Sequence, residues 1–224
     1  MPEADTPRPI LTGPRATPVT ALAFGAVGDD GQVVNRDQPF PVAPGDAYHG
    51  VLRPFRATAT LTRPADTAAY AIGDLIANST TAASVLPLSF SVGRFDGSDL
   101  KNPYILVTGV RLIASVGTPA VLPRLSLYAG DVPFAAAAYP ADNAPLRGSA
   151  GALTAAALAL EQVVGEVTSW TQAASGLAYA DLIPATPLAI AADATGIVRG
   201  LLEARNAALP TSGLIYTAIL RGLH

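Results

Sequence analysis

Reactive side chains are scarce in this chain of 224 residues. It has no cysteine, a single lysine (Lys101) and two histidines, His49 and His224. Without cysteine there is no disulfide framework, no thiolate nucleophile and no cysteine-ligated metal site. A Ser-His-Asp triad or a histidine metal site would have to use His49, which follows Asp46 in a Pro/Gly-rich stretch, or the terminal His224. The sequence therefore argues against an enzyme and predicts neither a cofactor nor a bound metal.

Charge and long apolar runs are also in short supply. Only 14% of the residues are charged, and the formal net charge is -3. The arginines are scattered singly and the sequence pI is about 5.3, whereas nucleic-acid binding needs a basic stripe. Glycine, proline or a charge interrupts each apolar stretch well short of the ~20 residues of a membrane-spanning helix. We therefore expect neither nucleic acid nor a membrane among the partners.

Small apolar residues, by contrast, are abundant. Half of the chain is hydrophobic, and much of that half is alanine. A chain of this length buries roughly 70% of its unfolded surface, so a real core is expected and bulk disorder is excluded. Apolar content above what a surface needs suggests that partners cover part of it. We therefore expect a homo-oligomer.

Residues 1–18 are predicted to form an extended, proline-rich arm. Five prolines in this segment exclude a helix and favour a polyproline-II-like path. Such an arm is either a disordered terminus or a segment ordered on a neighbouring subunit. Its candidate interface residues are Pro7, Pro9, Pro14 and Pro18. The segment has no basic region followed by an apolar one, so no secretory signal is expected.

Residues 19–55 are interpreted as a small β-hairpin appendage or linker. Asp29, Asp30 and Gly31 form a turn signal of the kind found in short hairpins. Several prolines between residues 39 and 44 break any continuation. The main domain is therefore expected to span residues 56–224.

Alternation of apolar and polar residues dominates the main domain and predicts an all-β fold. Two adjacent strands are expected at 104–116 and 124–129. Further strands are expected at 56–65, 70–76, 87–92, 188–192, 198–204 and 214–220, with residues 210–213 as the last hairpin loop. Short strands separated by turns are typical of sandwiches and barrels. About eight of them predict an antiparallel β-sandwich of jelly-roll type.

One segment favours a helix. Between residues 150 and 164, Leu153, Ala156, Ala157, Leu160 and Val164 share one face at helical spacing. The stretch that follows alternates like a strand. We expect a short helix or turn through the alanines, then a strand ending near residue 170; the choice between helix and strand for 150–160 stays open.

The sequence RPADTAAYAIGD at 63–74 predicts a structural corner between two strands. Pro64 fixes its backbone, Asp66 folds back in a turn, and Gly73 with Asp74 closes the corner. Tyr70 is expected to be buried with its hydroxyl bonded there. The full candidate set is Arg63, Pro64, Asp66, Tyr70, Gly73 and Asp74.

Other polar groups admit a functional interpretation beside the structural one. Asp66 and Asp74 could form a paired-carboxylate or calcium site, although neither fits a DxDxDG loop. The 95–103 loop, with Asp96, Asp99 and Asn102, could bind a cation or a sugar, but its residues are also ordinary turn formers.

The same holds for two features further along the chain. Residues 141–143 (ADN) are predicted to form an Asx turn. Trp170 is a candidate interface residue: it could be a glycan-stacking platform, but a lone tryptophan is more often core or subunit interface.

Three stretches of the chain form a pattern: LTRPADTAAYAIGDLIANST at 61–80, RLSLYAGDVPFAAAAYPADNAPL at 124–146 and GLLEARNAALPTSGLIYTAILRGL at 200–223. In these stretches the chain resembles a set of bacteriophage virion structural proteins. In those proteins an RPADTTAYAAGD-like opening, a RLHLY...ADNAAF middle and a LLVARGAFTP-like ending recur in this order. The chain departs from the pattern at 150–176, which is longer and richer in alanine, and in the proline-rich arm.

This resemblance implies a non-enzymatic protein of the viral particle. We expect a homo-oligomeric capsid decoration, stabilising or head-spike component that attaches through its N-terminal arm to the major capsid protein or another virion protein. It would be located in the virion and assembled in the host cytoplasm. The alternatives are a tail fibre or baseplate component, or a carbohydrate-binding β-sandwich module. The scarcity of aromatics, 6% of the residues, disfavours glycan binding.

Overall fold

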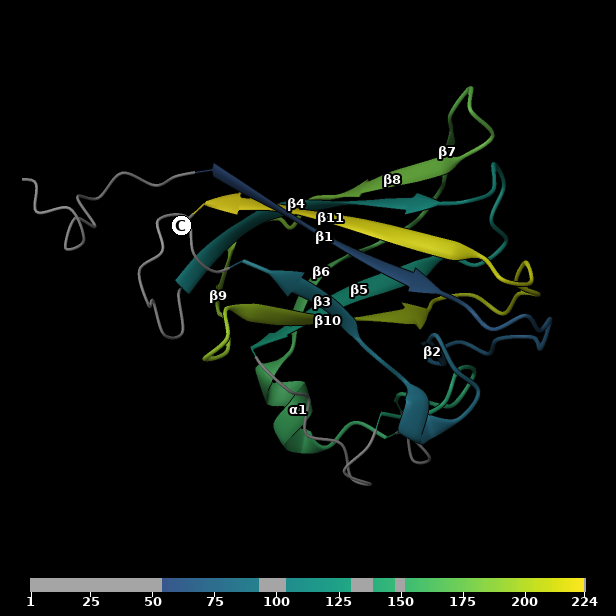
Figure 1. The fold of residues 1–224 in the computed structure, drawn as a ribbon, viewed down its shortest axis with the longest axis horizontal. Coiled ribbons are helices and arrows are strands. Elements are labelled where there is room, and N and C mark those ends of the chain that lie inside the picture. The colour runs from purple at the N-terminus through teal and green to yellow at the C-terminus, as the bar shows by residue number, and fades with distance from the viewer. Residues whose placement is uncertain (1–53, 93–103, 130–138, 148–151, 224) are drawn as a thin grey trace, which may run out of the picture. The chain divides into compact units, whose positions relative to one another are not determined.

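The computed structural model describes residues 54–92, 104–129, 139–147 and 152–223, all within one compact unit (Figure 1). The predicted arm at 1–18 and the turn at 29–31 lie outside the described residues, as does the loop at 95–103. Pro54 and Phe55, assigned above to the preceding linker, begin the first strand.

Two antiparallel sheets make up the described domain, which confirms the all-β sandwich (Figure 1). The first sheet has the order β1 (Pro54–Thr62), β11 (Ile215–Leu223), β4 (Tyr104–Ala114), β8 (Ala178–Leu182) and β7 (Thr171–Gln172), and β9 (Leu188–Ala191) also pairs with β4. In the second sheet, β2 (Leu75–Ile76) and β3 (Leu88–Ser91) pair with β10 (Ile197–Ala204), followed by β5 (Pro123–Ala129) and β6 (Gln162–Glu166).

The strand order is that of a jelly roll. One sheet contains β1-β11-β4-β8 and the other β3-β10-β5-β6, so the chain changes sheet at most of its connections. The strands at 104–116 and 124–129 are therefore not neighbours in one sheet, because β4 and β5 lie in opposite sheets. Residues 210–213 likewise join β10 to β11 across the sandwich, so the expected hairpin loop is wrong. Alternation reveals which face of a strand is buried, but it does not identify the strand with which it pairs.

Alternating side chains build the core between the sheets. In β1, Phe55, Ala57, Ala59 and Leu61 are buried, while the residues between them are exposed. In β11, Tyr216, Ala218 and Leu220 are buried in the same layer. A continuous apolar core results.

The outer face of the second sheet carries a smaller apolar cluster. Ala157 of α1 (Ala155–Leu160) packs there with Leu75, Tyr128 and Leu201. A 3-10 turn, Ala82–Ser84, lies nearby in the chain segment that leads to Val85 of this cluster. These segments cover a sheet face that would otherwise be exposed to solvent.

The short helix confirms one of the two possibilities for residues 150–160. The Thr154 hydroxyl caps it by accepting a 3.1 Å hydrogen bond from the Ala157 N–H. The predicted helical face is wrong, however, since Leu160 is 51% exposed and only Ala157 is buried within the helix. The helix ends at Leu160 and the chain turns extended at Glu161, so Val164 belongs to β6, which ends at Glu166. None of the described helices is long and apolar enough to cross a membrane.

Candidate functional site

A buried ion pair lies at the corner predicted from residues 63–74. The Nη2 of Arg63, directly after β1, donates to Oδ2 of Asp142 at 2.9 Å, and both side chains are essentially inaccessible. Its Nε donates to the Tyr70 hydroxyl at 2.5 Å and its Nη1 to the Thr211 carbonyl at 3.1 Å. Nη2 also reaches Asp66 at 3.2 Å. The guanidinium therefore ties three chain segments together; Arg63, Tyr70, Asp66 and Asp142 are called the corner cluster below.

Tyr70 completes the corner cluster. Its hydroxyl donates to Oδ1 of Asp142 at 2.6 Å, and the Ala77 N–H donates to the same oxygen at 2.7 Å. The side chain is 2% exposed, so its predicted burial and bonding are confirmed. Burial raises the pKa of Tyr70 far above its ordinary value, and the neighbouring Asp142 raises it further. The phenol is therefore neutral and links Arg63 to Asp142 through hydrogen bonds.

The remaining corner residues shape the backbone. Gly73 has φ +95°, a left-handed conformation that favours glycine. Its N–H donates to the carbonyl of Ala204 at the end of β10, at 2.8 Å. The Asp74 carboxylate accepts from the Ala71 N–H at 2.6 Å and closes the turn, while the Pro64 carbonyl accepts from the Gly213 N–H at 3.1 Å. The corner is thus fastened to the second sheet.

The two corner carboxylates have separate partners. Asp66 accepts from Arg63 and from the Ala68 N–H, whereas Asp74 serves the turn at Ala71. Within the described ranges, no group of three His, Cys, Asp or Glu residues is close enough to hold a metal ion. The arrangement gives the idea of a paired-carboxylate or calcium site no support.

Asp142 is the member of the corner cluster that sequence reasoning assigned to a turn alone. Residues 141–143 do turn, with the Ala144 N–H donating to the Ala141 carbonyl and Asn143 at φ 61°. The turn aims the Asp142 side chain inward, toward Arg63. The available signal was that a buried arginine requires an acid, yet the sequence does not reveal that Arg63 is buried.

A second charged cluster, which the sequence did not predict, lies on the outer face of the second sheet. Glu203 of β10 is 2% exposed and accepts from Arg124 at 2.7 Å, from Arg147 at 2.5 Å and from Arg205 at 3.0 Å. Glu161, just after α1, accepts from Arg147 and from the Ser126 hydroxyl. These residues, called the arginine–glutamate cluster, fasten α1 and the 139–147 segment to β5 and β10.

Each charge in this cluster has a partner of opposite sign. Burial alone would raise the pKa of Glu161, but the hydrogen bonds from Arg147 and Ser126 outweigh it, so its pKa lies below the ordinary 4.5. A carboxylate held ionised by two guanidinium groups is a poor general acid or base near neutral pH. The cluster therefore stabilises the packing of α1 and the 139–147 segment on the second sheet.

Trp170 packs inward with one polar tie. Its ring stacks on Tyr216 with centroids 6.2 Å apart and planes at 24°. Its Nε1 donates to the Val121 carbonyl at 3.0 Å. The side chain is half-buried against the main core. This packing disfavours an exposed stacking platform for a glycan.

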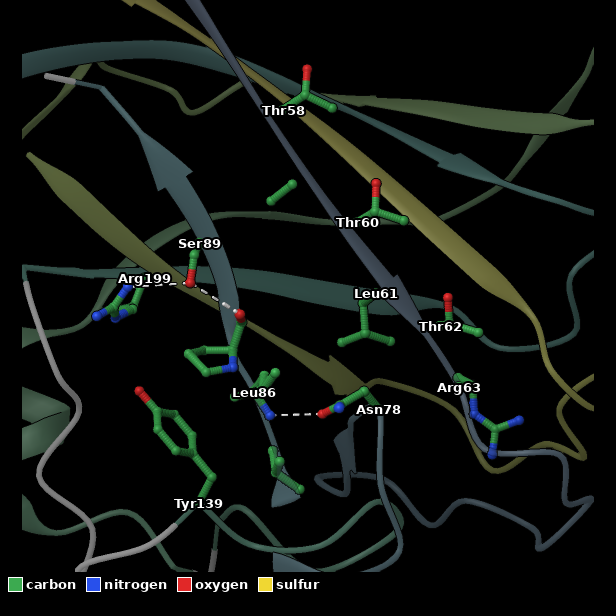
Figure 2. A pocket seen from close by; sticks show the side chains of 13 residues that line it. Thr58, Thr60, Leu61, Thr62, Arg63, Asn78, Leu86, Ser89, Tyr139 and Arg199 are labelled. Carbon is green, nitrogen blue, oxygen red and sulfur yellow. Dashed lines mark hydrogen bonds between the residues drawn. The ribbon is translucent and has the colours of Figure 1, made fainter. Parts of the chain in front are cut away.

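A groove of about 920 Å³ runs along β1, and we call it the edge groove. Figure 2 shows Thr58, Thr60 and Thr62 along β1, with Ser89 of β3 and Arg199 of β10 on the other side. Leu86 and Tyr139 also line it. The Arg199 Nη1 donates to the Ser89 hydroxyl at 3.2 Å. The groove thus combines hydroxyls, the two arginines Arg63 and Arg199, and several apolar side chains.

Comparison with known proteins adds no relative. No protein-family model matches the chain, and no curated protein matches it. The resemblance to bacteriophage virion proteins therefore rests on the three sequence stretches quoted above.

Proposed function

We propose that this chain is a non-enzymatic structural protein of a bacteriophage virion. It would act as a homo-oligomeric decoration, stabilising or head-spike component of the capsid, held to the major capsid protein or another virion protein by its N-terminal arm. The observation that carries the proposal is the use of charge: both buried clusters join strands and segments, and neither has a group of atoms arranged for chemistry. The three motif stretches supply the virion context.

The corner cluster supports this role because it belongs to the motif itself. Arg63, Asp66 and Tyr70 come from the RPADTAAY stretch, and Asp142 comes from the ADN stretch of the second motif. Thr211, whose carbonyl Arg63 contacts, lies in the third. The motif residues therefore meet at one structural corner. Such a meeting is expected if the motif residues hold the fold together, and a structural protein of a particle depends on a stable fold.

A tail fibre or baseplate position is the nearest alternative, because the same scaffold would serve there. A carbohydrate-binding module is less favoured, since such a module presents exposed aromatics on one sheet face. Here Trp170 is stacked against Tyr216 and bonded to Val121.

The proposal is tested by mass and by binding to particles. The purified full chain is measured by light scattering and then cosedimented with phage particles that lack it. We expect a defined oligomer that saturates the particles at a fixed stoichiometry. A variant lacking residues 1–18 is expected to keep its fold and lose most of this binding. A monomer without particle affinity contradicts the proposal, and full binding by the shortened variant contradicts the role of the arm.

A glycan array on the same preparation separates the alternatives. The virion proposal predicts no saturable binding to glycans, while a carbohydrate-binding module predicts selective binding to one class. Particle binding that a free sugar abolishes would favour the latter.

A further inference from the structure

The described edges of the two sheets differ sharply in how they are protected. β7 has two residues, β2 two and β3 four, and β6 has five and pairs with β5 through a register shift. Short strands and bulges are the usual means of preventing edge-to-edge association. β1 has nine residues and pairs with β11 without any shift. It is a long, regular edge of the kind that normally has a partner.

The backbone of β1 directs alternate groups outward. The Arg63 N–H donates to the Leu214 carbonyl, and on the other side of β11 the Ser115 N–H donates to the Ile215 carbonyl. These two bonds fix which backbone groups of β1 point toward β11. The N–H and C=O groups of Ala57, Ala59 and Leu61 do so. The N–H and C=O groups of Thr58, Thr60 and Thr62 therefore face the outer edge. Among the described residues, no backbone group pairs with them.

From this unpaired edge we infer that β1 is an interaction surface for a second copy of this chain, with the two β1 strands pairing antiparallel across a two-fold axis to make one continuous sheet. The inference rests on the proposed homo-oligomer and names the surface that it uses. The joined strands would exchange the main-chain hydrogen bonds that each edge lacks.

The outward residues of β1 are complementary to themselves. Whether the axis passes at Thr58, at Thr60 or between them, threonines face threonines, a favourable cross-strand pair. Arg56 is the only charged residue of the strand, and it would oppose a threonine or Pro64 in these registers. Arg56 therefore never faces its own copy. Both the backbone and the charge pattern permit self-pairing.

The edge groove provides room for the approach. It runs along this same edge, and its lining includes Thr58, Thr60 and Thr62 (Figure 2). Leu86, 69% exposed, stands in its wall. A second copy laid against β1 would cover this apolar side chain while it pairs the backbone. The same contact therefore satisfies polar groups and buries an exposed leucine.

Because the chain has no cysteine, single cysteines test the contact directly. Thr58→Cys, Thr60→Cys and the double variant are oxidised mildly in the full chain. The matched control is Thr217→Cys on β11, because Thr217 is the cross-strand partner of Thr60 on the same face, one strand inside the sheet. Directly opposed residues across β strands lie within disulfide reach.

We expect at least one edge variant to form covalent dimer at least about tenfold faster than the control, since opposed thiols react at a high effective concentration. The variant that responds identifies the register. Equal, slow oxidation of all edge variants and the control overturns the inference; that result is also expected if residues 1–53 of the same chain cover the edge.

A charge variant provides an independent measurement and separates this inference from the proposed function. Thr58→Lys/Thr60→Lys places like charges along the paired edge, and light scattering should show a smaller assembly than for the parent, whereas Thr217→Lys leaves the mass unchanged. An unchanged mass for the edge variant overturns the inference. Continued particle binding by that variant would leave the virion role intact, whereas a parent chain that is monomeric and does not bind particles contradicts both.

Discussion

The hydroxyl of Tyr70 donates a 2.6 Å hydrogen bond to the carboxylate of Asp142, which lies 72 positions away in the sequence. The same carboxylate receives the guanidinium of Arg63. Each of the three side chains therefore satisfies the other two in a place that water does not reach. Loss of the contacts among these three side chains should destabilise the whole sandwich.

Tyr70→Phe tests the phenol alone. The change removes a group that donates to Asp142 and accepts from Arg63 Nε, so buried polar atoms lose a partner. We expect the free energy of unfolding to fall by about 1–3 kcal/mol, measured by urea denaturation. The m value, which is the slope of the unfolding free energy against urea concentration, should stay the same. A stability equal to that of the parent would show that the hydroxyl adds nothing to the corner.

Asp142→Ala should have a larger effect. It leaves the inaccessible Arg63 guanidinium without its buried counter-ion, which costs about 3–5 kcal/mol. The matched control is Asp66→Ala, because Asp66 contacts the same nitrogen of Arg63 but is 31% exposed. The control should lose less than about 1 kcal/mol. Equal losses in the two urea titrations would contradict the buried pair as the source of stability.

Two glycines differ in the space around them. A Cβ at Gly222 would lie 2.6 Å from the Leu106 carbonyl oxygen and from a ring carbon of Phe55, whereas a Cβ at Gly165 would meet nothing closer than 3.6 Å. Gly222→Ala should therefore lower the unfolding free energy by about 1–3 kcal/mol through overpacking, and Gly165→Ala by much less. Thermal melting of the pair checks this order. The reverse order would contradict the close approach of β11 to β4.

Acid should weaken the contacts of Glu161 with Arg147 and Ser126. Its pKa is lowered in the folded chain, so its contribution to stability is present above the ordinary 4.5 and is lost as the pH falls through the folded value. At neutral pH, Glu161→Gln should be less stable than the parent by about 1–3 kcal/mol. The two stabilities should converge below about pH 4.5. Denaturation at several pH values measures the gap.

Glu166→Gln is the control for that series. The Glu166 side chain is half exposed, and its carboxylate forms an ion pair with Arg205. Its substitution should change stability by less than about 1 kcal/mol. A gap between Glu161→Gln and the parent that does not narrow in acid would argue against charge as its origin.

Trp170 is the only tryptophan and serves as a built-in reporter. Because its ring is stacked on Tyr216, its emission should move to longer wavelength in the same transition that removes the β-sheet signal in circular dichroism. Trp170→Phe loses the bond to Val121 and should cost about 1 kcal/mol. If the ring is also a subunit contact, as the sequence predicts, dilution of the folded protein shifts its emission as well.

The fold was predictable because most of its strands carry their own signal. The exposed threonines and buried apolar residues of β1 alternate, and a capped alanine run forms α1, the α-helix of the described residues. Pairing was harder. Nothing in the local sequence of 210–213 distinguishes a hairpin from a crossing between sheets, since both need the same turn residues.

The corner was predictable only in part, for a related reason. Pro64, Gly73 and Asp74 shape the local backbone, so this part of their role can be inferred from the RPADTAAYAIGD stretch, whereas the bond of Gly73 to Ala204 cannot. Asp142 acts on Arg63 from a distant segment, and Glu203 binds Arg124 and Arg147 from two others. Such contacts depend on which faces meet after folding, and this information is spread over the whole chain.

The position of β11 between β1 and β4 has a consequence for synthesis. The strand that begins the first sheet and the long strand at its centre are both made well before residues 215–223 leave the ribosome, and until then neither has its main partner. Contacts of such sequence separation form slowly. The growing chain therefore carries β1 without a partner and β4 with one edge open, because β4 can pair only with β8 and β9 until β11 is made. A chaperone that shields these edges should raise the yield of folded protein.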